Sequence, residues 1–520
     1  INFNLKEIIL DRLSGILIHP TSFPGKYGCG DLGEGAYKVI DTLKAAGQKI
    51  LQILPLGPTG FGDSPYQAFS AFAGTPYIIS FDKLIEDGYL TAEDLADYPA
   101  FDAAKVDYGM IYVENFKVLR KAFAKFQAIN KEKKRKPAAF TKFCKENAWL
   151  EDYATFMAIK DSKNGCSWDL WEEELRTRSN MKLSAEVKND VDFYKFVQWI
   201  FFKQWSEFKK YANKNGIKIV GDAPIFVSYD SSDVWANQHL FHLAPDGKPQ
   251  IVAGVPPDYF SATGQLWGNP HYNWEEMAKD GYQWWVDRMT NLLKLVDCVR
   301  VDHFRGFEAY WEVKYGEPTA QNGHWVKAPG MQLFSRFKEV FGESLAENII
   351  AEDLGIITKE VTELRDTFNF PGMKIFEFAP FDMNGMYTND DGQVVPNHTA
   401  PYLPSNYPEN CIAYPGTHDN DVILGWFNDA DDKAKGDILN YLQTDYEHLN
   451  EAIINRLLES KAKTVVFMMQ DVLRLGTECR MNKPGTSGSH NWSWRLTYDL
   501  LENSKDKFAS LAEATKKAGR

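Results

Sequence analysis

The chain carries eight short apolar runs, each bounded by turn-forming or polar residues, and most are followed by a segment with helical signals. Runs that are apolar throughout suit strands buried on both faces, and their alternation with helices indicates βαβ units in a parallel sheet. Eight such units predict an α/β fold of the (β/α)8 TIM-barrel type. The expected strands are Gly15–His19, Ile50–Pro55, Ile217–Gly221, Cys298–Asp302, Ile349–Glu352, Lys374–Phe378, Ile412–Tyr414 and Thr464–Met468.

The spacing of the runs is uneven, which predicts two insertions into a single catalytic barrel. Between strands 2 and 3 lie helix-like stretches at Tyr112–Phe126 and Phe193–Asn213, so we expect a mainly helical insertion there. The interval after strand 3 is rich in Pro, Gly and aromatic residues, which suits a loop-rich insertion with a cover over the active site. The expected ranges are 1–520 for the barrel, 57–216 and 226–297 for the insertions, and 253–267 for the cover loop.

Composition excludes several classes of partner. The formal net charge is −13, and an acidic surface repels a phosphate backbone, so we expect no nucleic-acid partner. No stretch is apolar for long enough to cross a bilayer, so we expect no membrane partner either. The six cysteines form no CxxC pair, which is typical of reduced thiols in a cytoplasmic protein and not of a disulfide framework or a zinc site. We interpret the basic run 131–136 as a solvated helix end.

Acidic side chains stand at the carboxyl ends of five predicted strands. In a barrel these ends meet at one rim, where catalytic groups gather. A single Asp there is usually a turn or helix cap, but five such positions are hard to explain as caps alone. Glycoside chemistry needs a carboxylate nucleophile, a protonated acid for the leaving oxygen, and negative charge near an oxocarbenium-like transition state. The acids are Asp222, Asp302, Glu352 with Asp353, Asp419 and Asp471, and Arg300, His303 and His418 lie beside them.

Other chemistries fit the sequence poorly. The segment Gly28–Gly33 matches G-x-G-x-x-G, but Pro20 and Pro24 separate it from the preceding strand and no acid ends the next one, so we interpret it as a helix-entry loop. The sequence contains no HExxH, P-loop or nucleophile-elbow motif. His303 and His418 could ligate a metal, yet their place beside the acids favours hydrogen bonds to sugar hydroxyls. We therefore expect neither a metal nor a cofactor.

Motifs along most of the chain closely resemble the amylomaltase family, the 4-α-glucanotransferases related to the α-amylases. Their number and their order make chance agreement negligible. The segments that carry the resemblance are Ser14–Gly25, Leu54–Pro58, Ser64–Tyr66, Gly221–Ile225, Ala253–Phe260, Gly264–Pro270, Arg300–Gly306, Ala351–Gly355, Thr417–Asn420, Arg480–Asn482 and Asn491–Arg495.

The resemblance implies transfer of α-1,4-glucan segments between malto-oligosaccharides by a retaining double displacement through a covalent glycosyl-enzyme. In that scheme Asp302 is the nucleophile, Glu352 is the general acid/base, and Asp419 stabilises the transition state by gripping sugar hydroxyls. Arg300 would orient Asp302. The remaining implied contacts are His303 and His418 to hydroxyls of the central glucose, Tyr66 stacked on that glucose, Trp267 stacked on the acceptor side, Asp222 to a nearby hydroxyl, and Asn482 to the donor chain.

Two alternatives remain open at the level of sequence. An α-1,4-glucan hydrolase would use the same three carboxylates and differ only in that water attacks the intermediate. A catalytically inactive glucan-binding protein is disfavoured by the intact Asp302, Glu352 and Asp419. The Pro-rich, aromatic cover loop favours transfer, because it suits a rigid wall on the acceptor side. Phe61 lies where some members of the family carry an aromatic surface for a second glucan site, and the sequence leaves that site open.

Overall fold

The computed structural model describes residues 12–257, 261–389 and 392–520. Asp258, Tyr259 and Phe260, which belong to the predicted cover loop, lie outside the described residues, as does the side chain of Phe61. The cover loop is therefore described only in part. None of the helices in the described ranges has both the length and the apolarity that are needed to cross a bilayer.

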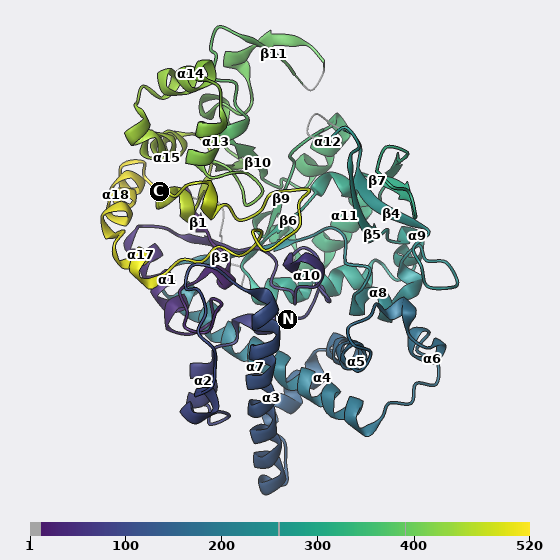
Figure 1. The fold of residues 1–520 in the computed structure, drawn as a ribbon. Coiled ribbons are helices and arrows are strands. Elements are labelled where there is room, and N and C mark those ends of the chain that lie inside the picture. Colours follow the sequence, from purple (N-terminus) through teal and green to yellow (C-terminus); the bar gives the residue numbers. More distant parts are fainter. Residues whose placement is uncertain (1–11, 258–260, 390–391) are drawn as a thin grey trace.

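Eight parallel strands form the central sheet, in the order β10-β13-β14-β1-β2-β3-β6-β9 (Figure 1). The ring closes between β9 and β10, where the backbone N–H of Ala351 donates to the carbonyl of Pro371 at 3.0 Å. All eight predicted strands are confirmed, with ends that shift by a few residues, and the fold is a (β/α)8 barrel. The strands are β1 (Leu13–Leu17), β2 (Ile50–Gln52), β3 (Lys218–Ala223), β6 (Cys298–Val301), β9 (Ile349–Ala351), β10 (Gly372–Ile375), β13 (Cys411–Tyr414) and β14 (Thr464–Met468).

The barrel strands are apolar throughout because both of their faces are buried. Every residue of β2, β6, β9, β13 and β14 is buried. One face packs inside the ring, where each strand contributes one or two side chains to a single cluster, and the other face packs against the outer helices. The inner cluster contains Leu17, Ile50, Val220, Cys298, Ile350, Met373, Ile375, Ile412, Tyr414, Val422, Val466 and Met468.

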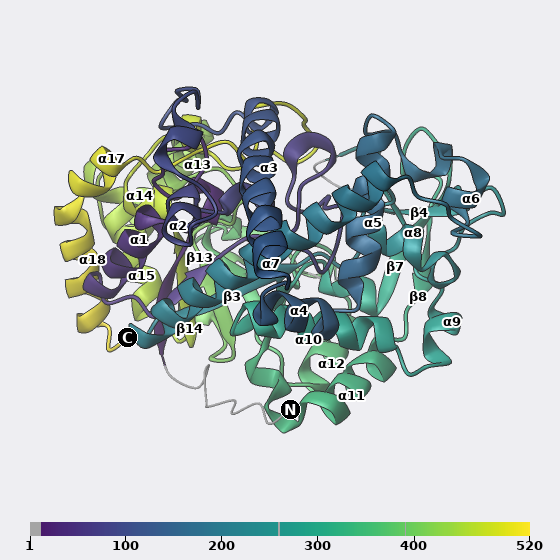
Figure 2. The same ribbon diagram turned by 90° about the horizontal axis from the view of Figure 1, so that it is seen from below.

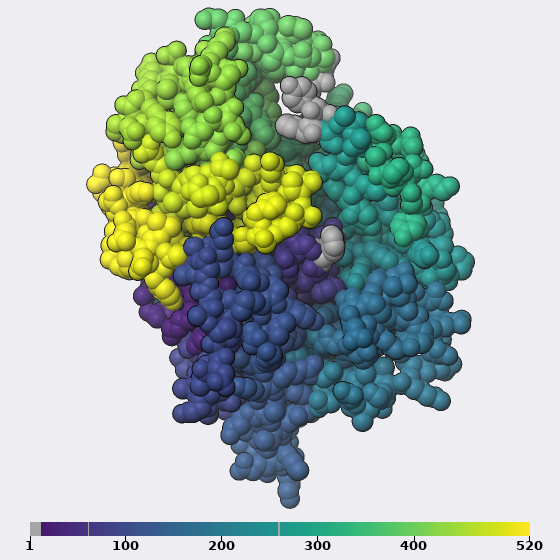
Figure 3. Space-filling model, in the orientation of Figure 1, coloured from purple at the N-terminus to yellow at the C-terminus, as the bar shows by residue number. Residues whose placement is uncertain are grey.

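The insertion after β2 is mainly helical. Its longest helices are α3 (Tyr108–Lys133) and α7 (Ala185–Lys214), which contain both predicted helical stretches and lie side by side in Figure 2, with the rings of Phe123 and Phe193 5.6 Å apart. The end of α3 projects from the body in Figure 3, and residues 131–136 are all exposed, as expected of a solvated helix end. The shorter helices are α2 (Phe81–Glu86), α4 (Ala138–Glu146), α5 (Trp149–Ser162) and α6 (Glu173–Arg176).

The insertion after β3 contains structure that the sequence did not predict. Strands β4 (Ile251–Val255) and β5 (Gln265–Pro270) form an antiparallel hairpin that joins β7 (Ala309–Lys314) and β8 (His324–Lys327) in a four-stranded sheet. The Gly and Pro residues in β5 hide its strand character, and β7 and β8 come from the segment after β6. We propose the division expected from the sequence, one barrel with insertions at 57–216 and 226–297, with this hairpin as the wall that carries the cover loop.

Helix α1 (Glu34–Ala45) supplies a test of packing against intrinsic propensity. A Cβ added at Gly35 would lie 1.8 Å from the carbonyl oxygen of Pro24, which is backbone and cannot move aside. Alanine gains at most about 1 kcal/mol of helix propensity, whereas overpacking costs about 1–3 kcal/mol. We expect Gly35→Ala to lower the free energy of unfolding, as measured by chemical denaturation.

Gly436 in α14 (Asp432–Leu442) provides the matched control, because a Cβ added there meets nothing within 4 Å. Gly436→Ala should raise the free energy of unfolding by about 0.5–1 kcal/mol. A Gly35→Ala variant as stable as Gly436→Ala would show that α1 can move away from Pro24.

Candidate active site

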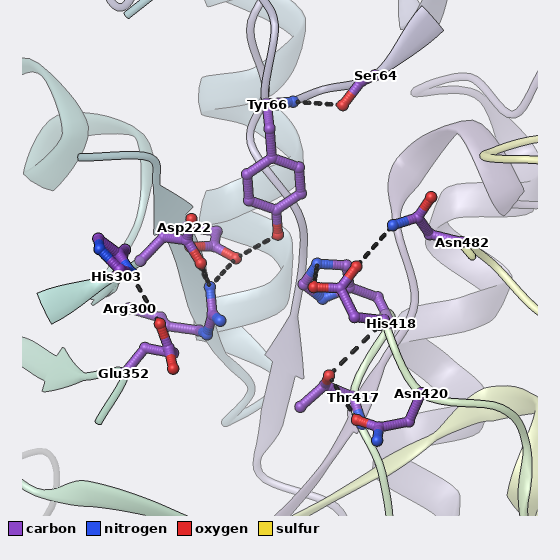
Figure 4. A network of polar contacts seen from close by, with 12 residues as sticks. Ser64, Tyr66, Asp222, Arg300, His303, Glu352, Thr417, His418, Asn420 and Asn482 are labelled. Atoms are coloured by element: carbon purple, nitrogen blue, oxygen red, sulfur yellow. Dashed lines mark hydrogen bonds and ion pairs between the residues drawn. The ribbon is translucent and has the colours of Figure 1, made fainter. Parts of the chain in front are cut away.

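The predicted site residues lie at the carboxyl ends of the barrel strands. Figure 4 shows Tyr66, Asp222, Arg300, His303, Glu352, His418 and Asn482 around one mouth. Asp222 lies in β3, Arg300 lies in β6, and Asp302 and Glu352 directly follow β6 and β9. Loops that follow the barrel strands, together with the β4–β5 hairpin, bring the remaining groups to the same mouth. They are Tyr66 after β2, Trp267 in β5, His303 after β6, His418 and Asp419 after β13, and Asn482 after β14.

A buried arginine connects two of the carboxylates. Nη1 of Arg300 donates to both oxygens of Asp222, at 2.9 and 2.8 Å, and to Oδ1 of Asp302 at 2.8 Å. The side chains of Arg300 and Asp222 are only 4% and 1% exposed, whereas that of Asp302 is 29% exposed. Asp302 therefore keeps an open face while the guanidinium fixes its orientation and stabilises its negative charge.

Tyr66 is fixed from two sides. Its hydroxyl donates to Oδ2 of Asp222 at 2.7 Å, and its ring stacks on that of His418, with centroids 5.1 Å apart and planes 11° apart. The ring of Trp492 packs behind both, 5.8 Å from Tyr66 and 6.0 Å from His418. Trp492 was not among the predicted site residues, although it belongs to a segment that carries the family resemblance. The three rings form a rigid apolar wall of the kind on which sugar C–H faces pack.

Glu352 is held by backbone and desolvated by the protein around it. Its two oxygens accept from the backbone N–H of His303 at 2.7 Å and of Leu354 at 2.9 Å. His303 has the left-handed conformation, φ 49° and ψ 50°, which aims that N–H at the carboxyl group. Burial raises the pKa of Glu352 to about 7; the Arg300 guanidinium opposes the rise and the charge of Asp302 adds to it. A large fraction of Glu352 is therefore protonated near neutrality.

Asp353 and Asp471, which also follow strands, do not take part. Asp353 is buried in an ion pair with Arg365 of α12 (Lys359–Thr367) and accepts from the backbone N–H of Met373 at 2.7 Å. Asp471 is fully buried and accepts at 2.8 Å from the backbone N–H of Ile423, the first residue of α13 (Ile423–Asp429). Their bonds to other structural elements predict a structural role for both acids, as is usual for an isolated strand-end Asp.

Asp419 is the most open of the three proposed catalytic carboxylates, with its side chain 46% exposed. Its Oδ1 accepts from Nδ2 of Asn482 at 2.6 Å, and its Oδ2 lies 3.4 Å from Nε2 of His418. The bond between Thr417 N–H and Oδ1 of Asn420, at 2.9 Å, tightens the turn that carries it (Figure 4). The turn thus presents a carboxylate to the mouth with both oxygens oriented.

Trp267 and His303 form the opposite wall. Their rings meet edge to face with centroids 5.0 Å apart, and Nε1 of Trp267 donates to Oε1 of Gln265 at 3.3 Å. Trp267 is half-buried: it packs against the main hydrophobic cluster, with the ring of Phe226 6.4 Å away, and keeps part of its surface exposed. Burial lowers the pKa of His303 to about 4, which keeps the imidazole neutral. Within the described ranges, no group of three or more His, Cys, Asp or Glu residues could hold a metal ion.

Comparison with known proteins identifies relatives over nearly the whole chain. The family model described as 4-alpha-glucanotransferase, glycoside hydrolase family 77, matches residues 18–501. The 4-alpha-glucanotransferase of Thermus thermophilus is 45% identical over 521 residues, covering 98% of this chain and 99% of that protein. The 4-alpha-glucanotransferase of Clostridium butyricum is 47% identical over 494 residues, covering 94% and 96%.

Solved structures agree with the sequence comparison. Amylomaltase from Streptococcus agalactiae in complex with acarbose superposes with a TM-score of 0.90 at 39% identity, covering 98% of this chain and 99% of that one. Amylomaltase from Corynebacterium glutamicum shares the fold, with a TM-score of 0.74 at 18% identity, over 97% of this chain and 75% of that one. On this evidence the chain belongs to the 4-alpha-glucanotransferase family, the amylomaltases.

Proposed function

We propose that this 4-alpha-glucanotransferase works by a retaining double displacement in which Asp302 is the nucleophile and Glu352 the general acid/base. Asp302 attacks the anomeric carbon while Glu352 protonates the glycosidic oxygen, so the bond to the leaving sugar breaks as the ester forms. An acceptor hydroxyl then gives its proton to Glu352 and displaces Asp302. The observation that carries the proposal is the contrast between neighbouring carboxyls, one bonded by Arg300 and one with a pKa of about 7.

The coupling between these two groups lets Glu352 serve in both steps. The negative charge of Asp302 is one of the causes that raise the pKa of Glu352. That charge disappears when Asp302 becomes an ester, so the pKa of Glu352 falls in the glycosyl-enzyme. The same carboxyl is therefore an acid when the donor arrives and a base when the acceptor attacks. No other group needs to move a proton.

Asp419, His418 and the neutral imidazole of His303 are proposed to bind hydroxyls of the sugar at the cleavage point. The two Asp419 oxygens are already oriented by Asn482 and His418, which supports a bidentate grip on neighbouring hydroxyls. The stacked rings of Tyr66 and His418 supply the apolar surface beside them. An uncharged His303 donates or accepts a hydrogen bond without adding positive charge near the oxocarbenium-like transition state.

Malto-oligosaccharides are the proposed donors and acceptors. The enzyme acts on α-glucans, as its family does, and the Streptococcus agalactiae relative binds acarbose. The proposed binding groups in this chain are aromatic walls with convergent carboxylates and imidazoles, which suit an uncharged carbohydrate. We also propose a cytoplasmic location, which the six free thiols support.

The wall that Trp267 and His303 form favours transfer over hydrolysis. Water is present at about 55 M, so transfer prevails only if a bound acceptor reaches a far higher effective molarity, which can be about 10⁵ M or more. Trp267, standing edge-on to His303 in a hairpin that is stiffened by the four-stranded sheet, is the proposed acceptor platform. A fixed platform and a cover that limits solvent both favour sugar over water.

The assignment of the two catalytic carboxyls is tested by substitution. Asp302→Asn should lower kcat of transfer at least about 10⁴-fold, because an amide cannot form the ester. Glu352→Gln should be severe for malto-oligosaccharide donors and milder for donors with a good leaving group, which needs no protonation. Product analysis from maltotriose measures the loss in both variants, and release of the leaving group from an activated glucosyl donor measures the milder effect of Glu352→Gln.

Asp353→Asn is the control for the neighbouring acid. Since Asp353 bonds Arg365 and the Met373 backbone, its loss should lower the melting temperature while the folded enzyme remains active. A stable Asp353→Asn protein without activity would mean that the wrong neighbour was chosen.

The pH profile is a second test. Glu352 must be protonated to form the glycosyl-enzyme, and its pKa of about 7 means that the protonated form is lost as the pH rises through 7. We expect kcat/KM for the donor to fall about tenfold per pH unit well above that value. His303 cannot produce this limb, because its pKa is lowered to about 4. A rate that stays constant up to pH 9 would argue against Glu352 as the acid.

The role of Trp267 is tested by the fate of the glycosyl-enzyme. Trp267→Ala should lose a ring contact of about 1–1.5 kcal/mol, so the ratio of transfer to hydrolysis should fall severalfold while the first step changes less. Leu266→Ala is the matched control, because Leu266 is 40% exposed on the same strand and points to the other face. A Trp267→Ala protein that melts much earlier with an unchanged ratio would show that this ring supports the hairpin only.

A further inference from the structure

We propose that Arg480 is a positioning residue that fixes Asp419 and Asn482 relative to each other and so sets the rate of the chemical step. The inference rests on the proposed role of Asp419. Arg480 does not touch the other catalytic carboxyls, and it acts through the backbone of the residues that it holds.

One guanidinium contacts both members of the pair. Nη2 of Arg480 donates to the backbone carbonyl of Asp419 at 2.6 Å, and Nε donates to the backbone carbonyl of Asn482 at 2.7 Å. The side chains of the same two residues are joined by the 2.6 Å bond from Asn482 to Asp419, whose amide end is visible in Figure 4. The result is a closed ring of three bonds, in which Arg480 fixes the main chains and Asn482 orients the carboxylate.

This clamp matters because the barrel itself does not hold the two segments together. The ladder between β13 and β14 consists of the pairs Ile412–Thr464 and Ala413–Val465. Asp419 and Asn482 lie well beyond these pairs, in loops that are joined by side-chain bonds such as those of Arg480, Asn482 and Thr477. A planar guanidinium with five donors in a rigid fork suits this bridge better than a flexible ammonium does.

The charge of Arg480 also suits its surroundings. Its Nη1 lies 3.8 Å from Oδ2 of Asp421, which in turn accepts from the hydroxyl of Thr477 at 2.9 Å. The loop thus carries two acidic side chains, Asp419 and Asp421, next to one cation. With its side chain only 23% exposed, Arg480 is partly shielded from water, which strengthens its bonds to the carbonyls.

The experiment compares Arg480→Met and Arg480→Lys with Arg474→Met. Arg474 is a matched control, since it also follows β14, is 25% exposed, donates to a backbone carbonyl (Tyr446, 2.9 Å) and pairs with an acid (Glu447, 3.2 Å), but lies outside the site. Displacement by about 1 Å can cost about 100-fold in rate. We expect Arg480→Met to lower kcat of transfer about 10- to 100-fold with KM within about threefold. Arg480→Lys should recover part of the loss, and Arg474→Met should match wild type.

A double substitution separates positioning from general loss of structure. If Arg480 acts through the Asn482–Asp419 pair, Arg480→Met and Asn482→Ala should be strongly non-additive in kcat. Additive losses would overturn the inference, as would a kcat of Arg480→Met within about threefold of wild type, or an equal loss in Arg474→Met. Rates are expressed per folded molecule. If Arg480→Met folds poorly, the kcat of Arg480→Lys is compared with that of wild type instead.

Asp419→Asn, measured in parallel, distinguishes failure of the proposed role of Asp419 from failure of the proposed role of Arg480. If Asp419→Asn keeps kcat within about tenfold of wild type, the proposed role of Asp419 fails and the inference about Arg480 fails with it. If Asp419→Asn is severely impaired while Arg480→Met is not, the proposed function stands and only the clamp is rejected.

Discussion

The active site depends on the charge of one buried arginine. The parallel register pairs Asp222 of β3 with Arg300 of β6, and Asp302 follows Arg300 by two residues, so all three side chains point into the mouth of the barrel. Burying an ion away from water costs several kcal/mol, and attraction to a partner ion offsets this cost only when the geometry is nearly ideal. Loss of any one of the three side chains would therefore leave a buried charge without its partner. Asp222, which Arg300 holds in place, in turn positions the hydroxyl of Tyr66.

The second constraint of the proposed scheme is that Glu352 keeps its proton although another carboxyl group, that of Asp302, lies close by. Glu352 follows β9, whose pairing with β6 places Ala351 beside Val301 and hence the two proposed catalytic acids on adjacent strand ends. Arg300 bonds Asp302 directly but contributes only a longer-range attraction to Glu352, whose own bonds are to backbone N–H groups. Burial is therefore the largest influence on the pKa of Glu352, whereas Asp302 is held by its bond to the guanidinium. Two similar side chains thereby acquire opposite roles without any metal or cofactor in the proposed scheme.

The barrel strands and the turns that follow them supply the carboxylates, and the two insertions together with the segment after β14 supply the walls. Tyr66 arrives on the segment after β2, Trp267 on the β4–β5 hairpin, and Trp492 on the segment after β14. Each ring packs on a group from another part of the chain: Tyr66 on His418, Trp267 on His303, and Trp492 on both Tyr66 and His418. Rigidity at these walls is what a transferase requires, since a sugar acceptor must be better placed than the water around it.

The sequence alone determined the eight strands, because residues buried on both faces must be apolar throughout, and the acids that follow them located the rim. The family motifs then pointed to the ten residues that the structure brings to one mouth. The strand-end pattern by itself did not separate Glu352 from its neighbour Asp353, a choice that came from the family resemblance. Nor did it show that Asp471 bonds the start of α13, because partners such as Arg365 and the Ile423 backbone come from other elements. It also missed the antiparallel sheet, the Trp492 wall and the Arg480 contacts. These arise from segments far apart in the chain, and only tertiary packing determines which distant groups share a hydrogen bond, and so which carboxyl keeps its proton.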